Sequence, residues 1–299
     1  MEFPNEDTQW TTSSSGADVG TVAPEPSERV LLLLRRLVDR SRRTTGLPLG
    51  EGFIRRADVS SGPPPLAVLL RGGRGGEVRL KLYLSMALLA VSPPYNLPVI
   101  PAWSWAELLD LPDPEHNGAR RVNEAIGWLV EHRLVVSDRR RGVSGAVRLL
   151  SQSGTGDPYA RPAGGGRYVK LPLGVWRDGW IVRLSGAALG LLIILLDLQG
   201  GRTKPQWISP SVARARYDLS ADTWTKGVRE LRCLGIVSVS RVSQGGFLDY
   251  RRLRNAYWVN EQALQGQEGN KSTRRAGRRT APRSRSSAKA QAATVTARS

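Results

Sequence analysis

The clearest pattern of apolar and polar positions spans residues 208–237 and predicts two helices joined by a tight turn. Ser209 and Ser220 suit the two helix starts, because a serine oxygen can accept a hydrogen bond from a free backbone N–H group. In the first helix we expect Val212 and Ala213 to face inward. The second helix has an apolar stripe of Trp224, Val228, Leu231 and Leu234. Its spacings are those of an amphipathic helix, so the stripe is expected to face a core.

The residues on either side of these helices complete a larger unit. Residues 236–240 alternate like a strand, and a second alternating run over 247–259 follows a Gln-Gly-Gly loop, which predicts a hairpin. Upstream, residues 186–198 are almost all apolar and follow Ser185, a suitable cap, so they predict a helix at the centre of a core. Helix, turn, helix and hairpin is the order of a winged helix-turn-helix, a module that places a helix in the DNA major groove.

Residues 77–150 predict another unit of the same kind, which comes first along the chain; we call it the first unit, and the unit around residues 208–237 the second. The expected elements of the first unit are helices over 80–91, 105–111 and 119–132 and strands over 134–136 and 146–150. At an offset of 102 residues, Ile126 falls on Val228 and Leu129 falls on Leu231. This offset predicts an internal repeat, with two copies of one domain in the chain.

Shifts in composition divide the chain into segments. Polar stretches of one charge predict disordered tails, and stretches rich in glycine, proline and serine predict linkers. The expected segments are a disordered acidic tail (1–26), an amphipathic basic helix (27–43), a linker (44–76), a first winged-helix-like domain (77–150), a linker (151–166), a second winged-helix domain (167–260) and a disordered basic tail (261–299). The predicted fold class is therefore mainly α with small β-hairpin wings (α+β), in two tandem winged-helix domains.

The charge of the chain is strongly positive and unevenly distributed. The 299 residues have a net charge of +18; residues 151–260 hold sixteen basic and seven acidic side chains, against nine and eight in residues 77–150. A basic surplus favours a polyanionic partner, because neutralising phosphates releases counterions. A GC-rich genome would also raise the arginine content, but it would not concentrate the surplus in one segment. The charge therefore favours nucleic-acid binding by the second domain.

Residues and motifs of several other functions are absent from the sequence. One cysteine excludes an internal disulfide, the two histidines stand apart, and no P-loop, GxSxG or HExxH motif occurs. We therefore expect no enzyme, no cofactor and no metal site. The N-terminus does not resemble a signal peptide, and the longest apolar run is too short to span a bilayer, so we expect a cytoplasmic, nucleoid-associated protein without a membrane partner. Cys233 is expected to be a small buried thiol.

The predicted outward face of the second unit provides candidate DNA contacts. Lys226 and Arg229 could bind guanine edges or phosphates, and Thr223 and Thr225 a phosphate or a thymine methyl group. The alternative is that these side chains are only solvated. The candidate contacts are Arg214, Arg216, Ser220, Thr223, Thr225, Lys226 and Arg229 on the two helices, Arg241, Arg251, Arg252 and Arg254 on the hairpin, and Arg120, Arg121 and Asn123 on the equivalent helix of the first unit.

The stretch ISPSVARARYDLSADTWTKGVRELRCLGIV resembles the winged helix-turn-helix domains of bacterial regulators such as the MarR and GntR families. The doubled arrangement over roughly 77–260 resembles plasmid replication initiators, in which one winged helix dimerises and the other binds origin repeats. These resemblances imply a recognition helix and a wing in the second domain. The chain departs from them in having neither a recognisable ligand-binding domain of the GntR kind nor an initiator-specific motif.

We therefore expect sequence-specific binding of double-stranded DNA, by a bacterial transcriptional regulator. One alternative is a replication initiator of a plasmid or integrated element that binds origin repeats. Another is a winged-helix protein-interaction module without sequence-specific DNA binding. The expected places for a homodimer contact are the first winged helix and the helix over residues 27–43.

Overall fold

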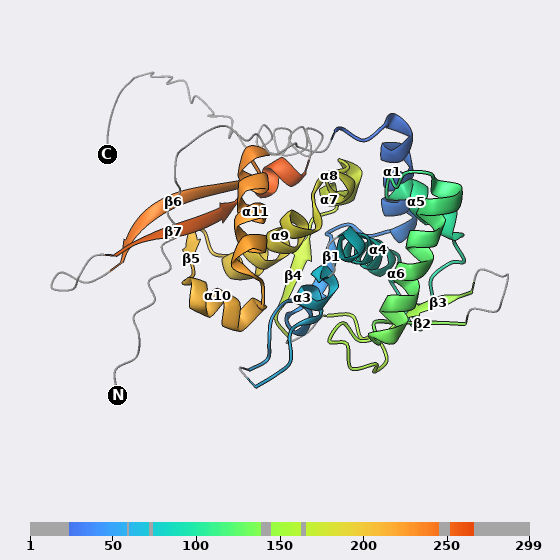
Figure 1. The fold of residues 1–299 in the computed structure, drawn as a ribbon, viewed down its shortest axis with the longest axis horizontal. Helices are drawn as coiled ribbons and strands as arrows, with labels where there is room; N and C mark the ends of the chain where they lie inside the picture. The colour runs from blue at the N-terminus through green and yellow to red at the C-terminus, as the bar shows by residue number, and fades with distance from the viewer. Residues whose placement is uncertain are drawn as a thin grey trace, which may run out of the picture.

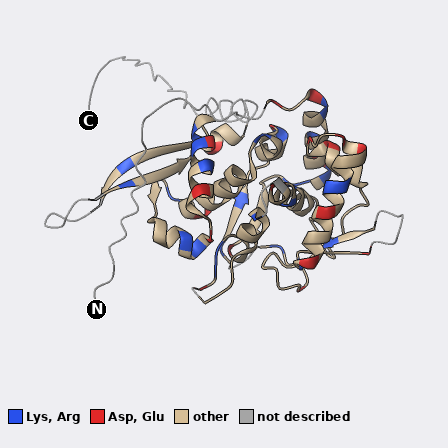
Figure 2. Cartoon of the chain, in the orientation of Figure 1, with Lys and Arg blue, Asp and Glu red and all other residues tan. Residues whose placement is uncertain are grey.

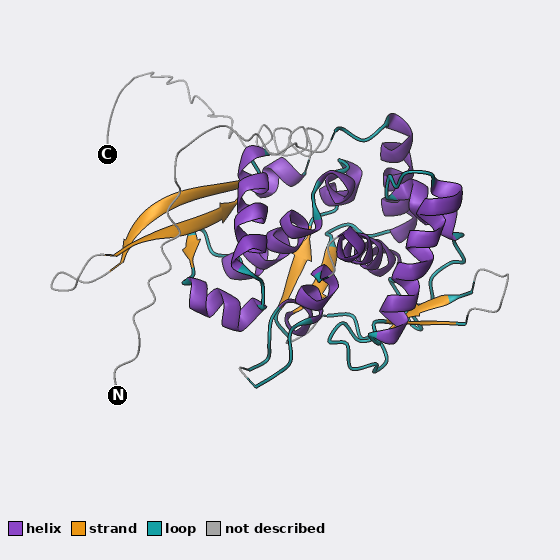
Figure 3. Cartoon of the chain, viewed as in Figure 1, coloured by secondary structure: helices purple, strands orange, loops and turns teal. Residues whose placement is uncertain are grey.

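A computed structural model describes residues 24–58, 60–71, 74–138, 145–162, 166–244 and 252–265. In these ranges the chain folds into many helices and a few small antiparallel sheets (Figures 1 and 3). The expected α+β class is confirmed at this level. The tails that were expected to be disordered lie almost entirely outside the described residues.

The C-terminal half of the chain is built around α9, which spans Gly186–Gln199. Ser185 begins this helix as expected, because its Oγ accepts a hydrogen bond from the Ala188 N–H at 3.2 Å. Every α9 residue except Ala187 is buried, since the helix is apolar on nearly all sides and has to be covered by other elements. The prediction of a central core helix is confirmed.

Two helices and a hairpin follow α9 in the predicted order. The elements are β5 (Gln206–Trp207), α10 (Pro210–Tyr217), α11 (Ala221–Cys233), β6 (Val237–Gln244) and β7 (Arg252–Val259). The three strands form an antiparallel sheet of order β5-β7-β6. The Oγ atoms of Ser209 and Ser220 accept hydrogen bonds from Val212 N–H at 3.3 Å and Thr223 N–H at 3.1 Å, so both predicted caps are confirmed. Ala213 is buried as expected, whereas Val212 is exposed.

The first unit has a closely similar order of elements. It consists of α4 (Arg74–Leu89), α5 (Ala102–Leu108), a π-helical turn (Pro114–Gly118), α6 (Ala119–Glu131), β2 (Val135–Ser137) and β3 (Val147–Leu149). In place of β5 it has a single antiparallel bridge between Asn96 and Arg148. The short helix begins at Ala102 rather than behind Ser104, with Pro101 preceding it. Pro101 is the N-cap residue and provides no side-chain cap, although it has no backbone N–H group of its own to satisfy.

Equivalent backbone hydrogen bonds occur within each of the two units at the predicted offset of 102 residues. Their third helices, α6 and α11, begin and end at this offset. After α6 the Leu134 N–H donates to the Leu129 carbonyl at 3.0 Å, and after α11 the Ile236 N–H donates to the Leu231 carbonyl at 2.9 Å. Arg133 and Gly235, the preceding residues, both have the left-handed backbone conformation. The offset thus persists from the apolar pattern into the backbone geometry.

Residues 44–76, expected to be a linker, are largely folded. They contain β1 (Leu47–Gly50), α2 (Glu51–Ile54), α3 (Pro65–Leu70) and the first residues of α4. β1 pairs with β4 (Tyr168–Leu171), and Leu47, Leu49, Phe53 and Leu66 are fully buried. The linker prediction was wrong because the glycines and prolines lie at the ends of very short helices and strands here. These short elements carry apolar residues into a shared core.

The same packing corrects other predicted boundaries. The buried apolar residues form one continuous cluster from Val30 to Leu264, so the two units share a core. In the second predicted linker, Gln152 and Tyr159 are buried, although residues 151–162 contain no helix or strand. The expected basic tail begins with a folded turn over Glu261–Leu264.

The predicted N-terminal helix is confirmed as α1 (Glu28–Ser41). Its apolar face packs within the same chain, against α4 and against α7 (Gly174–Arg177), which precedes α8 (Trp180–Arg183). Val30, Leu34, Leu37 and Val38 are buried by this packing. The expected homodimer contact through this apolar face is therefore not supported. None of the helices in the described ranges is long and apolar enough to cross a bilayer.

Candidate nucleic-acid interface

Five of the predicted contacts of the second unit lie on α11 or at its N-terminal cap. Ser220, Thr225, Lys226 and Arg229 are exposed, and Thr223 is half-buried with its Oγ1 2.8 Å from the Ser220 Oγ. Lys226 forms an i,i+4 ion pair with Asp222 at 2.8 Å. Such an exposed pair contributes only about 0.3–0.5 kcal/mol, so it leaves Lys226 able to exchange Asp222 for another anion.

Cys233 lies on the outer face of α11 and is exposed, which corrects the expectation of a buried thiol. The reason is the helical period: Cys233 is four residues beyond the exposed Arg229, whereas Leu231 is fully buried. Because the chain has one cysteine, this thiol is a specific chemical reporter for the outer face of α11.

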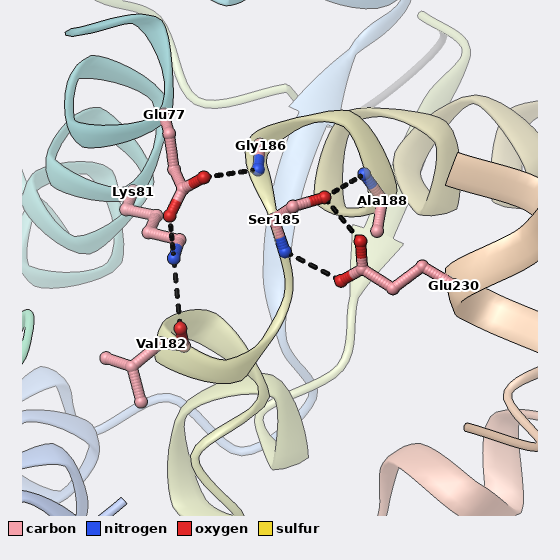
Figure 4. Close-up of polar contacts among 7 residues, drawn as sticks. All are labelled: Glu77, Lys81, Val182, Ser185, Gly186, Ala188 and Glu230. Atoms are coloured by element: carbon pink, nitrogen blue, oxygen red, sulfur yellow. Dashed lines mark hydrogen bonds and ion pairs between the residues drawn. The ribbon is translucent and has the colours of Figure 1, made fainter. Parts of the chain in front are cut away.

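The inner face of α11 is held against the start of α9 by a carboxylate (Figure 4). Glu230 accepts hydrogen bonds from the Ser185 N–H at 2.8 Å and from the Ser185 hydroxyl at 2.5 Å. A second carboxylate, Glu77 of α4, accepts from the Gly186 N–H at 3.0 Å. Carboxylates are favourable at a helix N-terminus, because its free N–H groups carry partial positive charge. Helices from both units thus converge on one end of α9.

A buried lysine completes this junction. Lys81 donates to Glu77 Oε1 at 2.6 Å and to the Val182 carbonyl at 3.0 Å. Its ammonium group compensates for the charge of Glu77 and ties α4 to α8 just before the start of α9. The position of α11 is therefore set by a polar network as well as by apolar packing.

Gly227 provides the close contact between α11 and α9. A β-carbon at Gly227 would lie 2.9 Å from the Ala187 carbonyl oxygen and 3.0 Å from Leu191, whereas Gly127 on α6 has nothing within 4 Å. We expect Gly227→Ala to destabilise the protein by about 1–3 kcal/mol despite the better helix propensity of alanine. Gly127→Ala, the matched control, should stabilise it by about 1 kcal/mol. Urea unfolding of both variants measures this difference, and stabilisation by Gly227→Ala would contradict the tight contact.

The position of α10 is set by a buried hydrogen bond to α9. The Tyr217 hydroxyl donates to Asp197 Oδ2 at 2.8 Å, and both side chains are buried. Burial, and then the neighbouring Asp197 carboxylate, raises the pKa of the Tyr217 phenol well above its ordinary value, so the hydroxyl remains a donor at neutral pH. Arg214 and Arg216 lie in the last turn of α10 and are exposed. This end of α10 is therefore basic on the outside and fixed on the inside.

The hairpin presents its arginines on two faces. Tyr257 of β7 packs edge-on against Trp224 of α11 and pairs with Val239, so Arg241, two residues further along β6, lies on the ribbon face that carries Tyr257. Arg241 is exposed, whereas Arg254 is half-buried and lies on the opposite face. Arg251 and the side chain of Arg252 lie outside the described residues.

The equivalent face of the first unit differs in charge. At the offset of 102 residues, α11 presents Asp222, Thr225, Lys226, Arg229, Arg232 and Cys233, and α6 presents Arg120, Asn123, Glu124, Gly127, Val130 and Glu131. The α11 set has three basic residues and one acidic residue, whereas the α6 set has one basic residue and two acidic residues. Figure 2 shows Lys and Arg on α10, α11 and the hairpin.

Two of the three predicted contacts of the first unit are also less available. Arg121 is half-buried, whereas Arg120 is exposed and forms with Glu124 a surface pair of the same kind as that of Lys226. Asn123 is half-buried and lines a small cavity with Leu97 and Ile126. α4 and α9 lie between α6 and α11, so the structure does not bring the two predicted sets together (Figure 1).

Sequence reasoning missed two arginines beside the turn between α10 and α11. Arg56 and Arg71, both in the segment taken for a linker, form ion pairs with Asp218. No local pattern could have identified them, because 162 and 147 residues separate them from Asp218 in the chain. Two arginines from outside the second unit therefore lie beside the turn between its two helices.

Comparison of the chain with protein-family models, with curated proteins and with solved structures finds no match.

Proposed function

We propose that the protein binds double-stranded DNA in a sequence-specific manner, as a bacterial transcriptional regulator built from two tandem winged-helix domains. The single observation on which this depends is the exposed face of α11, whose inner side is fixed on α9 and whose outer side carries Lys226, Arg229 and Arg232. A helix of this kind, held rigidly with its basic side outward, can enter the major groove and bind base edges and phosphates.

The order of elements supports the winged-helix assignment. A helix, a short strand, two helices and a hairpin, with the short strand paired to the second hairpin strand, is the arrangement around α11. The hairpin corresponds to the wing, and Arg241 on its α11-facing side is suited to a phosphate near the recognition helix. The first unit has a similar order around α6, with a face that is not basic, so we assign DNA recognition to the second unit.

The proposal is tested by selecting full-length protein on fragmented genomic DNA at physiological salt and sequencing the retained fragments. A shared motif that occurs singly at promoters is the expected result. Clustered repeats of a motif would instead indicate a replication initiator. Retention without any shared motif would overturn sequence-specific recognition. The remaining alternative would then be a winged-helix module that binds other proteins.

Cys233 offers an independent test of the docking face. A bound duplex that covers the outer face of α11 should slow alkylation of this thiol by a maleimide reagent, because the thiol is exposed in the free protein. The rate with a random duplex at high salt, where phosphate contacts are weak, is the control. Equal alkylation rates in the presence and absence of the selected DNA would contradict docking through α11.

A further inference from the structure

The turn between α10 and α11 is clamped from outside its own unit. Asp218 has the left-handed backbone conformation at the C-terminus of α10, two residues before the Ser220 cap of α11. Its Oδ1 accepts a hydrogen bond from Arg56 at 2.7 Å, and its Oδ2 accepts one from Arg71. The backbone N–H of Arg56 also donates to the backbone carbonyl of Arg216 at 2.9 Å. The segment around Arg56 is thus anchored to the last turn of α10.

The two guanidinium groups differ in accessibility. The Arg56 side chain is 21 % exposed, and its Nε is buried without a hydrogen-bond partner among the described atoms. The Arg71 side chain is 59 % exposed even though it forms an ion pair with Asp218. Arg56 therefore anchors the turn, whereas Arg71 keeps donors that can reach a ligand in solvent.

The charge around this turn is positive. Asp218 is balanced by one of its two arginines, and Arg214 and Arg216 are exposed in the preceding helical turn. Because cations beside the recognition helix, rather than on its outer face, lie next to the DNA backbone, a cluster at this point suits phosphates at the edge of the groove.

We propose that Arg71 is an additional phosphate contact, so that the DNA-binding surface extends from α11 across the turn onto the N-terminal segment. This inference rests on the proposed DNA binding by α11. Asp218 orients Arg71 and also weakens its attraction for a phosphate, because the carboxylate competes for the same guanidinium group.

Two substitutions with opposite expected effects test this role. Arg71→Ala should weaken binding of the selected motif and of random duplex alike, by roughly three- to tenfold, and should lower the slope of log affinity against log salt by about 0.9. Asp218→Asn, which keeps a residue that tolerates the left-handed conformation, should strengthen binding of both duplexes. Arg29→Ala, which removes an exposed, ion-paired arginine on α1, is the matched control and should change little.

The alternative, in which Arg71 only holds the turn, predicts that both Arg71→Ala and Asp218→Asn weaken binding. That result, or a salt slope unchanged by Arg71→Ala, overturns the inference about Arg71. The proposed function survives in that case if substitution of Lys226 and Arg229 still weakens binding of the motif. Arg71→Lys retains the charge and should retain the slope. Thermal unfolding of each variant ensures that folded protein is compared. If the wild-type protein retains no DNA, the proposed function and this inference fall together.

Discussion

Replacing Lys226 and Arg229 together by alanine should abolish most of the sequence-specific DNA affinity while leaving the fold intact. Each contact to a base edge contributes roughly 1–3 kcal/mol, so the loss of both should lower affinity for the selected motif by about 2–6 kcal/mol. The fold should survive, because both side chains are exposed on α11 and the Lys226 ion pair is a weak surface pair. Fluorescence titration with motif and random duplexes measures the effect.

The control for this experiment removes the same charge elsewhere. Arg35→Ala with Arg36→Ala deletes two exposed arginines from α1, which packs against α4, α5 and α7 rather than against α11. This control should lower affinity for both duplexes slightly and equally, through the long-range charge alone. If the α11 variant also lost affinity equally for motif and random DNA, Lys226 and Arg229 would contact phosphates only. Unchanged binding by the α11 variant would show that α11 is not the recognition helix.

Glu230→Ala should produce the largest loss of stability among the polar substitutions at the site. The substitution removes the acceptor for the Ser185 N–H and the Ser185 hydroxyl at the partly buried start of α9. Hydrogen bonds to a charged group contribute about 1.5–3 kcal/mol each, so we expect a decrease of roughly 3 kcal/mol in the free energy of unfolding. Urea unfolding monitored through the tryptophans measures this change.

Glu230→Ala should also weaken DNA binding, because Glu230 holds α11 in position although its side chain does not face outward. At a temperature where the variant is fully folded, affinity for the motif should fall more than affinity for random duplex. The salt slope should stay the same, since no phosphate contact is removed. Glu124→Ala is the matched control: Glu124 is an exposed carboxylate on α6 paired with Arg120, and its loss should change stability by less than about 0.5 kcal/mol. A Glu230 variant as stable as this control would contradict a positioning role.

The local features of the second unit followed from the sequence by itself. The caps at Ser185, Ser209 and Ser220 and the stripe that buries Leu231 depend on interactions within a few residues, so periodicity and capping preferences identify them. The offset of 102 residues was likewise visible, because α6 and α11 each repeat the same apolar spacing. The polar outer face of α11 follows from the same periodicity, since the residues that are not buried have to face solvent.

The tertiary structure alone decided how these pieces are joined. Phe53 and Leu66 belong to a core shared by both units, and Glu230, Arg56 and Arg71 each bind a group that is far away in the chain. Such contacts depend on which elements become neighbours after folding, and no residue pattern within a short window records this. The sequence therefore determined which helix has a basic outer face. Only the packing of distant segments determined how that helix is held and which additional arginine lies beside it.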